Sequence, residues 1–297
     1  MVNIRKIDVC IPTWNSGRTL DQCLRSVIRE IPVNCIRILD KSSSDNTLEI
    51  AKRYNASIIQ NDCGLGKARQ LLMESVETEY FLFIDSDVML ANSWFKKIKE
   101  VLNKDQTIGA ICGFVFTDNP QDRHVSETFW KKAPRERIGS KNLRMIGLNN
   151  CLIKTDAVKG IEIPDWLNNY EDQFIGDYIM SKGYRWVIVK DALCFHSLGE
   201  TGFWKTIRGR RYYGAGLRFW KDEDENATEK KLLNRIIQDS IASVPLAIRA
   251  NDPLVIPFKA LCSLYTLVGY VGSSPKLLDE IDYDSDYKRQ YSKFKRK

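Results

Sequence analysis

Histidine and closely spaced cysteines are scarce in this sequence. Only two of the 297 residues are histidines, and the eight cysteines are scattered without a CxxC motif and lie mostly within apolar runs. This spacing argues against a zinc site and against a disulfide framework. We therefore expect buried thiols in a reducing compartment. The first apolar run is also too short and too close to the start for the core of a signal peptide, so we expect the protein to reside in the cytoplasm.

Low-complexity segments and internal repeats are also missing. Nine prolines, 43% hydrophobic and 28% charged residues are typical of an ordinary folded protein. The formal net charge is +7, and the basic residues are spread over most of the chain, which argues against nucleic-acid binding. Two denser basic stretches, residues 205–218 and 288–297, fit either an anionic partner or a solvated face.

Four short apolar runs predict strands, and three amphipathic segments between them predict helices. The strands are expected at residues 7–11, 35–39, 57–60 and 80–84, and the helices at residues 19–30, 45–54 and 66–76. Strands that alternate with helices of this length predict a parallel, doubly wound sheet. Ligands bind beyond the carboxyl ends of such strands, which is where Asn15, Asp40, Asp62 and Asp85 fall. The pattern therefore indicates a nucleotide site.

After about residue 110 the alternation weakens. A strand at 108–116, a polar loop at 117–121, a helix at 172–182 and a strand at 185–189 are expected to finish a mixed sheet. From residue 232 onward two apolar stretches predict a separate helical module. We therefore predict a catalytic domain at residues 1–225, with a donor half at about 1–110 and an acceptor half at about 111–225. Residues 226–297 form the predicted C-terminal helical module.

The predicted strand at residues 80–84 ends in two carboxylates, Asp85 and Asp87. Burying both charges there would be unfavourable without a cation. A Mg²⁺ or Mn²⁺ ion held by carboxylate and phosphate oxygens would compensate them, because such ions use few protein ligands and bind substrate phosphate. By itself an Asp-x-Asp pair is more often a turn or a helix cap.

Five segments, taken in order, resemble motifs of glycosyltransferase family two. They are CIPTWNSGRTL at 10–20, ILDKSSSDNT at 38–47, NDCGLGKARQ at 61–70, FIDSD at 83–87 and YEDQFIGDYIMSKGYRWVIVKDALCFH at 170–196. The resemblance covers roughly residues 7–200. It implies an α/β protein of the GT-A fold, which is Rossmann-like with a mostly parallel mixed sheet flanked by helices, here followed by a C-terminal helical extension.

The resemblance implies an inverting, metal-dependent hexosyltransferase that uses a nucleotide-diphosphate sugar donor. The expected acceptor is a glycan or, if the C-terminal stretches contact a membrane, a lipid-linked phosphate such as a polyprenyl phosphate. Asp172 is the implied catalytic base, and Glu171 is the alternative base or a substrate contact. The implied metal is Mn²⁺ or Mg²⁺, held by Asp85, Asp87 and His196.

The implied contacts to the nucleotide sugar are Pro12, Thr13, Trp14, Asn15, Asp40, Asn61, Gly66, Lys67, Arg69, Asp85 and Ser86. Asn149, Arg208, Arg210 and Arg211 are candidate contacts to a phosphate or to the acceptor. The family's usual second acidic residue after Asp40 is replaced by Lys41, which leaves the identity of the base open.

Other interpretations of these residues remain open. His196 fits a structural histidine, the turn around Gly66 fits a solvated loop, and Glu171 with Asp172 fits an acidic first helical turn. The altered Lys41 also permits a non-catalytic protein that binds sugar nucleotides. A sugar nucleotidyltransferase would share the sheet but needs a glycine-rich, arginine-containing loop after the first strand, which PTWNSGRTL at 12–20 is not.

The two C-terminal apolar stretches, residues 232–248 and 254–272, are a candidate membrane contact. The second is near the lower limit of roughly 20 residues for a spanning helix. Together with the basic residues at 288–297, they fit interfacial helices in one leaflet. Our hypothesis is peripheral attachment to the cytoplasmic face. The alternative is a helical hairpin that packs on the catalytic domain or in a dimer interface.

Overall fold

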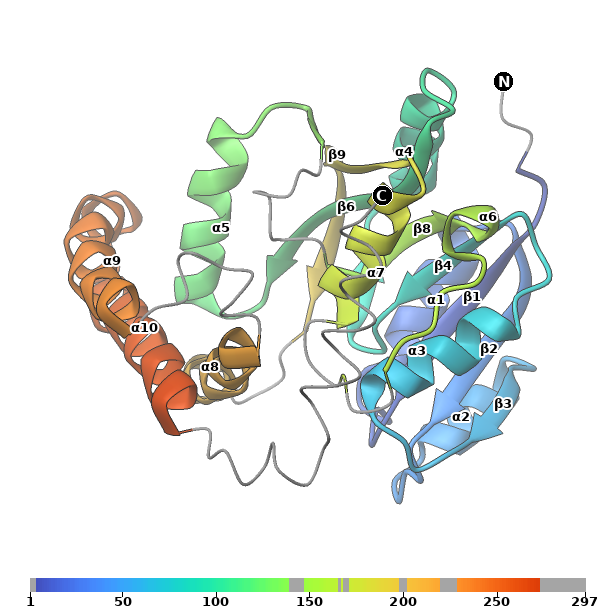
Figure 1. Ribbon diagram of the computed structural model, residues 1–297, viewed down its shortest axis with the longest axis horizontal. Coiled ribbons are helices and arrows are strands. Elements are labelled where there is room, and N and C mark those ends of the chain that lie inside the picture. Colours follow the sequence, from blue (N-terminus) through green and yellow to red (C-terminus); the bar gives the residue numbers. More distant parts are fainter. Residues whose placement is uncertain are drawn as a thin grey trace. The chain divides into compact units, whose positions relative to one another are not determined.

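A computed structural model describes residues 4–138, 147–164, 167, 171–197, 202–219 and 229–272. Within these residues one nine-stranded sheet has the order β3-β2-β1-β4-β8-β6-β9-β5, with β7 paired to β9 (Figure 1). The strands are β1 (Ile7–Thr13), β2 (Val33–Asp40), β3 (Ser57–Gln60), β4 (Tyr80–Ile84), β5 (Val88–Leu90), β6 (Ile108–Thr117), β7 (Glu136–Ile138), β8 (Asn150–Lys154) and β9 (Arg185–His196). The predicted mixed sheet is confirmed.

Ten helices lie in the same described ranges. They are α1 (Leu20–Glu30), α2 (Thr47–Arg53), α3 (Leu65–Glu74), α4 (Trp94–Leu102), α5 (Pro120–Lys132), α6 (Thr155–Val158), α7 (Glu171–Ser181), α8 (Gly202–Phe219), α9 (Glu229–Ala250) and α10 (Val255–Gly272). The apolar spacing in α1 buries Leu20, Leu24 and Val27, as the helical periodicity predicts.

Strands β3, β2, β1 and β4 run parallel to one another, and β8 runs antiparallel to β4. All five residues of β4 are buried, and so are six of the seven in β1. Continuous burial is typical of parallel strands that are covered on both faces. The carboxyl ends of β1, β2 and β4 therefore lie next to one another at one edge of the sheet.

The expected polar loop at 117–121 is wrong in its second half, because Pro120 and Gln121 already belong to α5. Proline is tolerated in the first turn of a helix. The preceding Asn119 is buried, and its Oδ1 accepts a hydrogen bond from the Asp122 backbone N–H at 2.8 Å, which caps the helix. The cysteines are all free, and six of the eight are buried.

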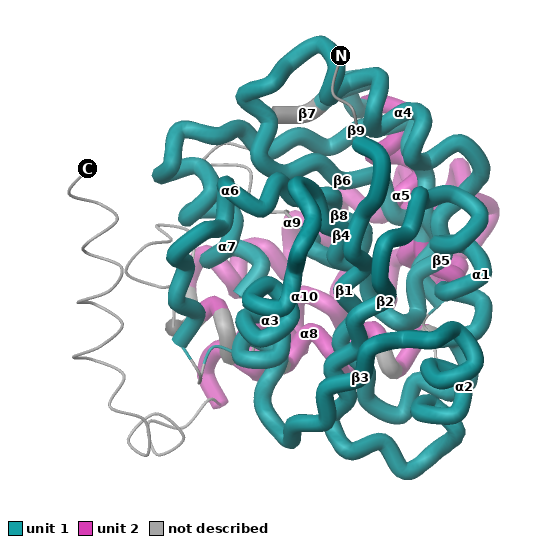
Figure 2. The backbone as a smooth tube through the Cα atoms, turned by 90° about the vertical axis from the view of Figure 1, so that its right-hand side faces the viewer, with its two compact units in different colours: residues 1–116, 133–197, 294–297 teal, residues 117–132, 198–293 magenta. Residues whose placement is uncertain are grey.

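The chain divides into two compact units (Figure 2). Unit 1 contains residues 1–116, 133–197 and 294–297, and it holds the sheet. Unit 2 contains residues 117–132 and 198–293. These ranges and the predicted domains divide the chain at different places, so the boundary near residue 225 stays a prediction.

In unit 2, α8 and α10 approach each other closely at two glycines. A Cβ atom on Gly214 would lie 1.9 Å from the Thr266 carbonyl oxygen, and one on Gly269 would lie 1.9 Å from the Arg211 carbonyl oxygen. Side chains larger than hydrogen would push the two helices apart. By length and composition α10 could cross a membrane, and 39% of it is buried within the protein. A buried helix of a soluble protein would have the same properties, so the composition alone decides nothing.

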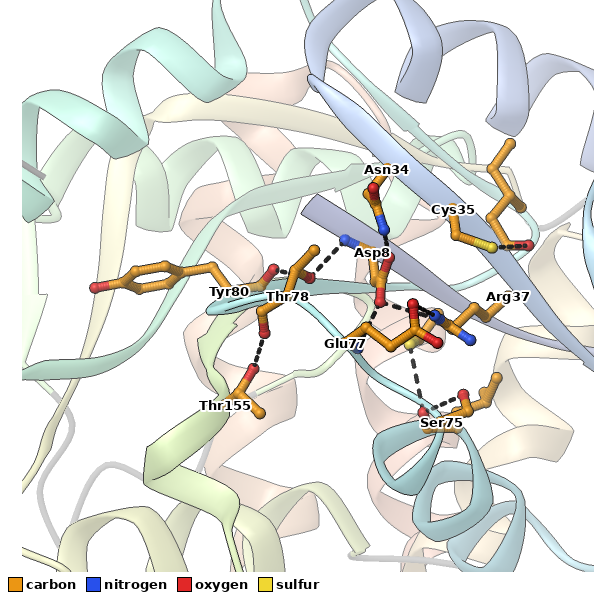
Figure 3. Close-up of polar contacts among 12 residues, drawn as sticks. Asp8, Asn34, Cys35, Arg37, Ser75, Glu77, Thr78, Tyr80 and Thr155 are labelled. Atoms are coloured by element: carbon orange, nitrogen blue, oxygen red, sulfur yellow. Dashed lines mark hydrogen bonds and ion pairs between the residues drawn. The ribbon is translucent and has the colours of Figure 1, made fainter. Parts of the chain in front are cut away.

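A buried carboxylate, Asp8, ties the start of β1 to its neighbours (Figure 3). Its oxygens accept hydrogen bonds from Asn34 Nδ2 at 2.8 Å, from Arg37 Nε at 3.0 Å and from the Glu77 backbone N–H at 2.8 Å. These partners come from β2 and from the connection between α3 and β4. Asp8 therefore joins three segments of the parallel sheet at the end opposite the carboxyl edge.

We predict that Asp8→Ala lowers the free energy of unfolding by about 3 kcal/mol, because the change leaves the nearly buried Arg37 guanidinium without this partner. Urea denaturation measures the effect. Glu100→Ala is the control, since Glu100 pairs with Arg135 at the surface, and it should change the midpoint little. Equal midpoints for wild type and Asp8→Ala would contradict the assignment.

Candidate functional site

A cavity of about 370 Å³ lies at the carboxyl ends of β1, β2 and β4, within unit 1. Seven of the residues predicted for the site line it, namely Pro12, Thr13, Trp14, Asp85, Ser86, Asp87 and His196. Lys41 also lines the cavity, together with Leu39, Cys63, Leu65 and Ala68. The sequence drew attention to Lys41 only as a departure from the family pattern. The apolar residues at the start of α3 carried no signal of their own.

The loops after β1 and β2 hold each other in place beside the cavity. The Ser16 backbone N–H donates to Thr47 Oγ1 at 2.7 Å, and the Gly17 backbone N–H donates to Asp45 Oδ2 at 2.9 Å. Asn15 is also used within these loops, where its Oδ1 accepts a hydrogen bond from the Ser44 backbone N–H at 2.9 Å. Its side chain therefore shapes the loop.

Asp40 is fully buried at the end of β2. Its carboxylate accepts hydrogen bonds from the Ser43 backbone N–H at 2.9 Å and from Thr13 Oγ1 at 3.4 Å. The carboxylate therefore holds the loops after β1 and β2 together. Asp40 is not among the residues that line the cavity. Asn61 lies in the next loop, where its backbone N–H donates to the Asp40 carbonyl oxygen at 3.1 Å.

Arg69 connects the two acidic parts of the site. Its side chain is 4% exposed, and its Nε lies 3.1 Å from Glu171 Oε1 while its Nη2 lies 3.4 Å from Asp85 Oδ1. The guanidinium also stands over the Phe83 ring, 5.2 Å from its centroid. One buried cation from α3 therefore joins the end of β4 to the beginning of α7.

Burial shifts the titration of the carboxylates around Arg69. It raises the pKa of Glu171 to about 7, against the opposing effect of the Arg69 charge. Burial likewise raises the pKa of Asp172 and of Asp85, and Arg69 again opposes the shift. Because these carboxylates share one buried guanidinium, the site carries excess negative charge when all are ionised. A cation would be attracted to it.

The residues at the end of β4 fit a divalent metal ion. His196 ends β9 and is the register partner of Val88, and its Nε2 lies 3.1 Å from Asp87 Oδ2. Asp85 lines the same cavity. In the parts of the chain that the structure describes, no three histidine, cysteine or acidic side chains converge tightly enough to form a complete ligand set. Carboxylate and imidazole donors suit Mn²⁺, and phosphate and water would supply the remaining ligands.

The remaining predicted residues lie outside the cavity lining. Gly66 is buried in α3, where a Cβ atom would lie 2.1 Å from the Leu167 carbonyl oxygen, so close packing requires glycine there. Lys67 follows in the same helix. The carbonyl oxygen of Asn149 accepts a hydrogen bond from the Asp85 backbone N–H at 3.2 Å. The three predicted arginines, Arg208, Arg210 and Arg211, belong to α8 of unit 2.

A mixed sheet with an acidic pair beside a cavity, at the exit of a central parallel strand, is typical of glycosyltransferases with the GT-A fold. The model of the glycosyl transferase family 2 matches residues 8–160, which is just over half of the chain. The protein belongs to glycosyl transferase family 2.

Curated relatives include two enzymes that act on poly(ribitol-phosphate). The chain is 33% identical over 210 residues to the Staphylococcus aureus β-N-acetylglucosaminyltransferase TarS, covering 66% of this chain and 36% of that protein. It is 30% identical over 187 residues to a β-glucosyltransferase of Bacillus spizizenii, covering 57% of this chain and 28% of that protein. The chain thus spans about a third of the length of these relatives.

Solved structures share the fold. Residues 1–349 of S. aureus TarS in complex with UDP-GlcNAc superpose with a TM-score of 0.57 at 16% identity, over 90% of this chain and 91% of that one. The mannosyltransferase PcManGT from Pyrobaculum calidifontis, in complex with GDP-Man and Mn²⁺, gives 0.57 at 16% identity, over 93% and 79%. At this identity the likeness establishes the GT-A fold alone.

Proposed function

We propose that this protein is an inverting glycosyltransferase whose cavity at the ends of β1, β2 and β4 binds a nucleotide-diphosphate sugar. The observation that carries the proposal is the link through Arg69, which joins the carboxylates beside the cavity to the acidic start of α7. Sugar transfer needs both parts together, because the leaving diphosphate and the attacking acceptor meet at one anomeric carbon. The cavity also has the volume typical of sites for small ligands.

The solved relatives support this class of donor. Their structures hold UDP-GlcNAc in one case and GDP-Man with Mn²⁺ in the other. In this chain Asp85, Asp87 and His196 would hold Mn²⁺ or Mg²⁺. When bound, such an ion neutralises charge on a diphosphate leaving group. Ser86 lies between the two carboxylates, and its Oγ is 2.7 Å from Ser16 Oγ, which fixes the loop after β4 to the loop after β1.

Asp172 is the proposed catalytic base. It lies in the first turn of α7, and its Oδ1 accepts a hydrogen bond from the Gln173 backbone N–H at 2.7 Å. Its neighbour Glu171 is buried against Arg69. Asp172 is therefore the better placed of the two to accept a proton from an acceptor hydroxyl, and Glu171 holds the start of the helix against Arg69.

We also propose that the acceptor is a glycan or a lipid-linked phosphate and that residues 226–297 form a module that touches the cytoplasmic face of a membrane. Support comes from an apolar stripe on α9, whose five members are 42% to 75% exposed. They are Leu233, Ile237, Ile241, Val244 and Ile248, spaced along one helix face. Basic residues on the same helix, including Arg235 and Arg249, suit anionic headgroups. The basic stretch at 288–297 lies outside the described residues.

Asp172→Asn should lower the rate of sugar transfer by about 10³-fold and leave the donor affinity within about twofold, because only the proton acceptor is lost. Asp177→Asn, on the same helix, is the matched control and should retain activity. Single-turnover transfer together with calorimetric binding of the donor measures both effects. A fully active Asp172→Asn enzyme would show that the base is another residue.

The rate should also depend on pH in a defined direction. A base must be ionised to accept a proton, so activity is lost as the pH falls through the pKa of Asp172. Since burial raises this pKa, the loss begins at a higher pH than for an ordinary aspartate. Arg69→Met should move the acidic limb to a still higher pH, because the Arg69 charge holds the pKa down. If the folded Arg69→Met enzyme loses activity at the same pH as the wild type, the Arg69 charge does not control the pKa of the base.

Mn²⁺ together with the nucleoside diphosphate that binds should raise the melting temperature, because a ligand that binds only the folded state stabilises it. Asp87→Ala and His196→Ala should each abolish the part of this shift that depends on the metal. His124→Ala is the control, since the other histidine of the chain is in α5 and lies 3.8 Å from Asp252. A metal-dependent shift that survives both site variants would place the ion elsewhere.

Flotation with vesicles tests the membrane contact. The full chain should float with vesicles of phosphatidylserine and phosphatidylcholine, and Ile237→Asp with Ile241→Asp should abolish flotation by placing charge in the apolar stripe. Asn234→Asp with Gln238→Asp adds the same charge at exposed polar positions of α9 and should float. If the wild-type chain stays at the bottom, the stripe does not bind a membrane.

A further inference from the structure

Lys41 is the first residue after β2, and its side chain lines the cavity. Its Nζ stands 5.9 Å from the centroid of the Trp14 ring, which comes from the loop after β1. Among the described residues no carboxylate forms an ion pair with this ammonium. The two side chains therefore offer a ligand one aromatic face and one uncompensated cation.

The backbone beneath this pair is held in an unusual conformation. Asn15 and Ser42, which follow Trp14 and Lys41 directly, both have a φ of 49°, a left-handed region that is uncommon for residues other than glycine and that asparagine tolerates better than serine. The Asn15 backbone N–H donates to Ser43 Oγ at 2.8 Å, and the Lys41 backbone N–H donates to the Thr13 carbonyl oxygen at 2.9 Å. The strained pair is thus fixed by contacts between the two loops.

The Asp40 carboxylate, one residue earlier, does not compete with Lys41 for a ligand. It is fully buried, and its two oxygens are already engaged by Ser43 and Thr13. The polar group that the end of β2 presents to the cavity is therefore an ammonium, which donates hydrogen bonds and accepts none.

The position of Lys41 along the sheet indicates which part of a nucleotide it meets. In the sheet order β2-β1-β4, the end of β2 lies two strands from the end of β4, where Asp85 and Asp87 follow. Two strand spacings amount to about 10 Å. If the diphosphate of a nucleotide lies beside Asp87 and His196, its ribose spans the intervening distance, and its base then lies beside Trp14 and Lys41.

We propose that Trp14 and Lys41 form the base subsite and that Lys41 selects a base with a carbonyl oxygen at C4 of a pyrimidine or at C6 of a purine, namely uracil, thymine or guanine. This inference rests on the proposed function. Trp14 is 66% exposed and can stack on any base, so it contributes affinity without selectivity. The Lys41 ammonium can donate a hydrogen bond to the C4 carbonyl oxygen of uracil or the C6 carbonyl oxygen of guanine, whereas the amino group at the same position of cytosine or adenine would set donor against donor.

Isothermal titration of the full-length chain in the presence of Mn²⁺ tests the selection with two matched pairs, UDP against CDP and GDP against ADP. UDP should bind about tenfold tighter than CDP, and GDP about tenfold tighter than ADP, in each pair that binds, in keeping with the discrimination of a single good base contact. Lys41→Met keeps the aliphatic stem and should bring each ratio to about one by weakening the binding of UDP or GDP.

Two further variants complete the test. Trp14→Ala should weaken all nucleotides that bind and leave the ratio unchanged. Lys52→Met removes the same charge from α2, outside the cavity lining, and should alter neither quantity. Equal binding within each pair, or a ratio that survives Lys41→Met, would overturn the base selection and leave the proposed function intact. Failure of all four nucleotides to bind wild type would overturn the donor site itself.

Discussion

The buried guanidinium of Arg69 is the interaction on which the site depends. It lies between Asp85 and Glu171, and it packs over the Phe83 ring. Glu171 is 102 residues after Arg69 in the chain. Without this cation, carboxylates from two elements would face one another at low dielectric, which would raise their pKa values and weaken the contact between α7 and the end of β4. The geometry of both proposed reacting parts, the donor end and the base, therefore depends on one side chain.

The two ends of the cavity differ in charge and in residue type along the edge of the sheet. The carboxylates after β4 lie beside His196 at the end of β9, whereas Lys41 follows β2 and the exposed Trp14 follows β1. An elongated ligand with phosphate at one end and an aromatic base at the other fits this order. The loops after β1 and β2 are bonded to each other, so the base end is already arranged before a ligand arrives.

The alternating pattern over residues 7–84 predicted β1 to β4 and α1 to α3, because apolar runs and helical spacing are strong local signals there. The carboxyl edge of that sheet then predicted a nucleotide site near Asn15, Asp40, Asp62 and Asp85, and of these four residues Asp85 lines the cavity. The sequence did not predict the short strands β5, β7 and β8 or the polar helix α5, because their pairing and capping depend on distant residues. The structural roles of Asp40 and Gly66 also depend on distant residues and could not be predicted from the sequence. Only the folded chain places Asp40 against Thr13, or Gly66 against the Leu167 carbonyl, 101 positions away.

The proposed function requires the ends of β1, β2 and β4 to hold a nucleoside diphosphate with a divalent ion. Anomalous diffraction at the manganese edge, from crystals soaked with Mn²⁺ and a nucleoside diphosphate, tests it most directly. We expect a peak within coordination distance of Asp87 and His196, joined to diphosphate density, with the base beside Trp14. A nucleotide bound elsewhere, or a manganese peak away from both side chains, would contradict it.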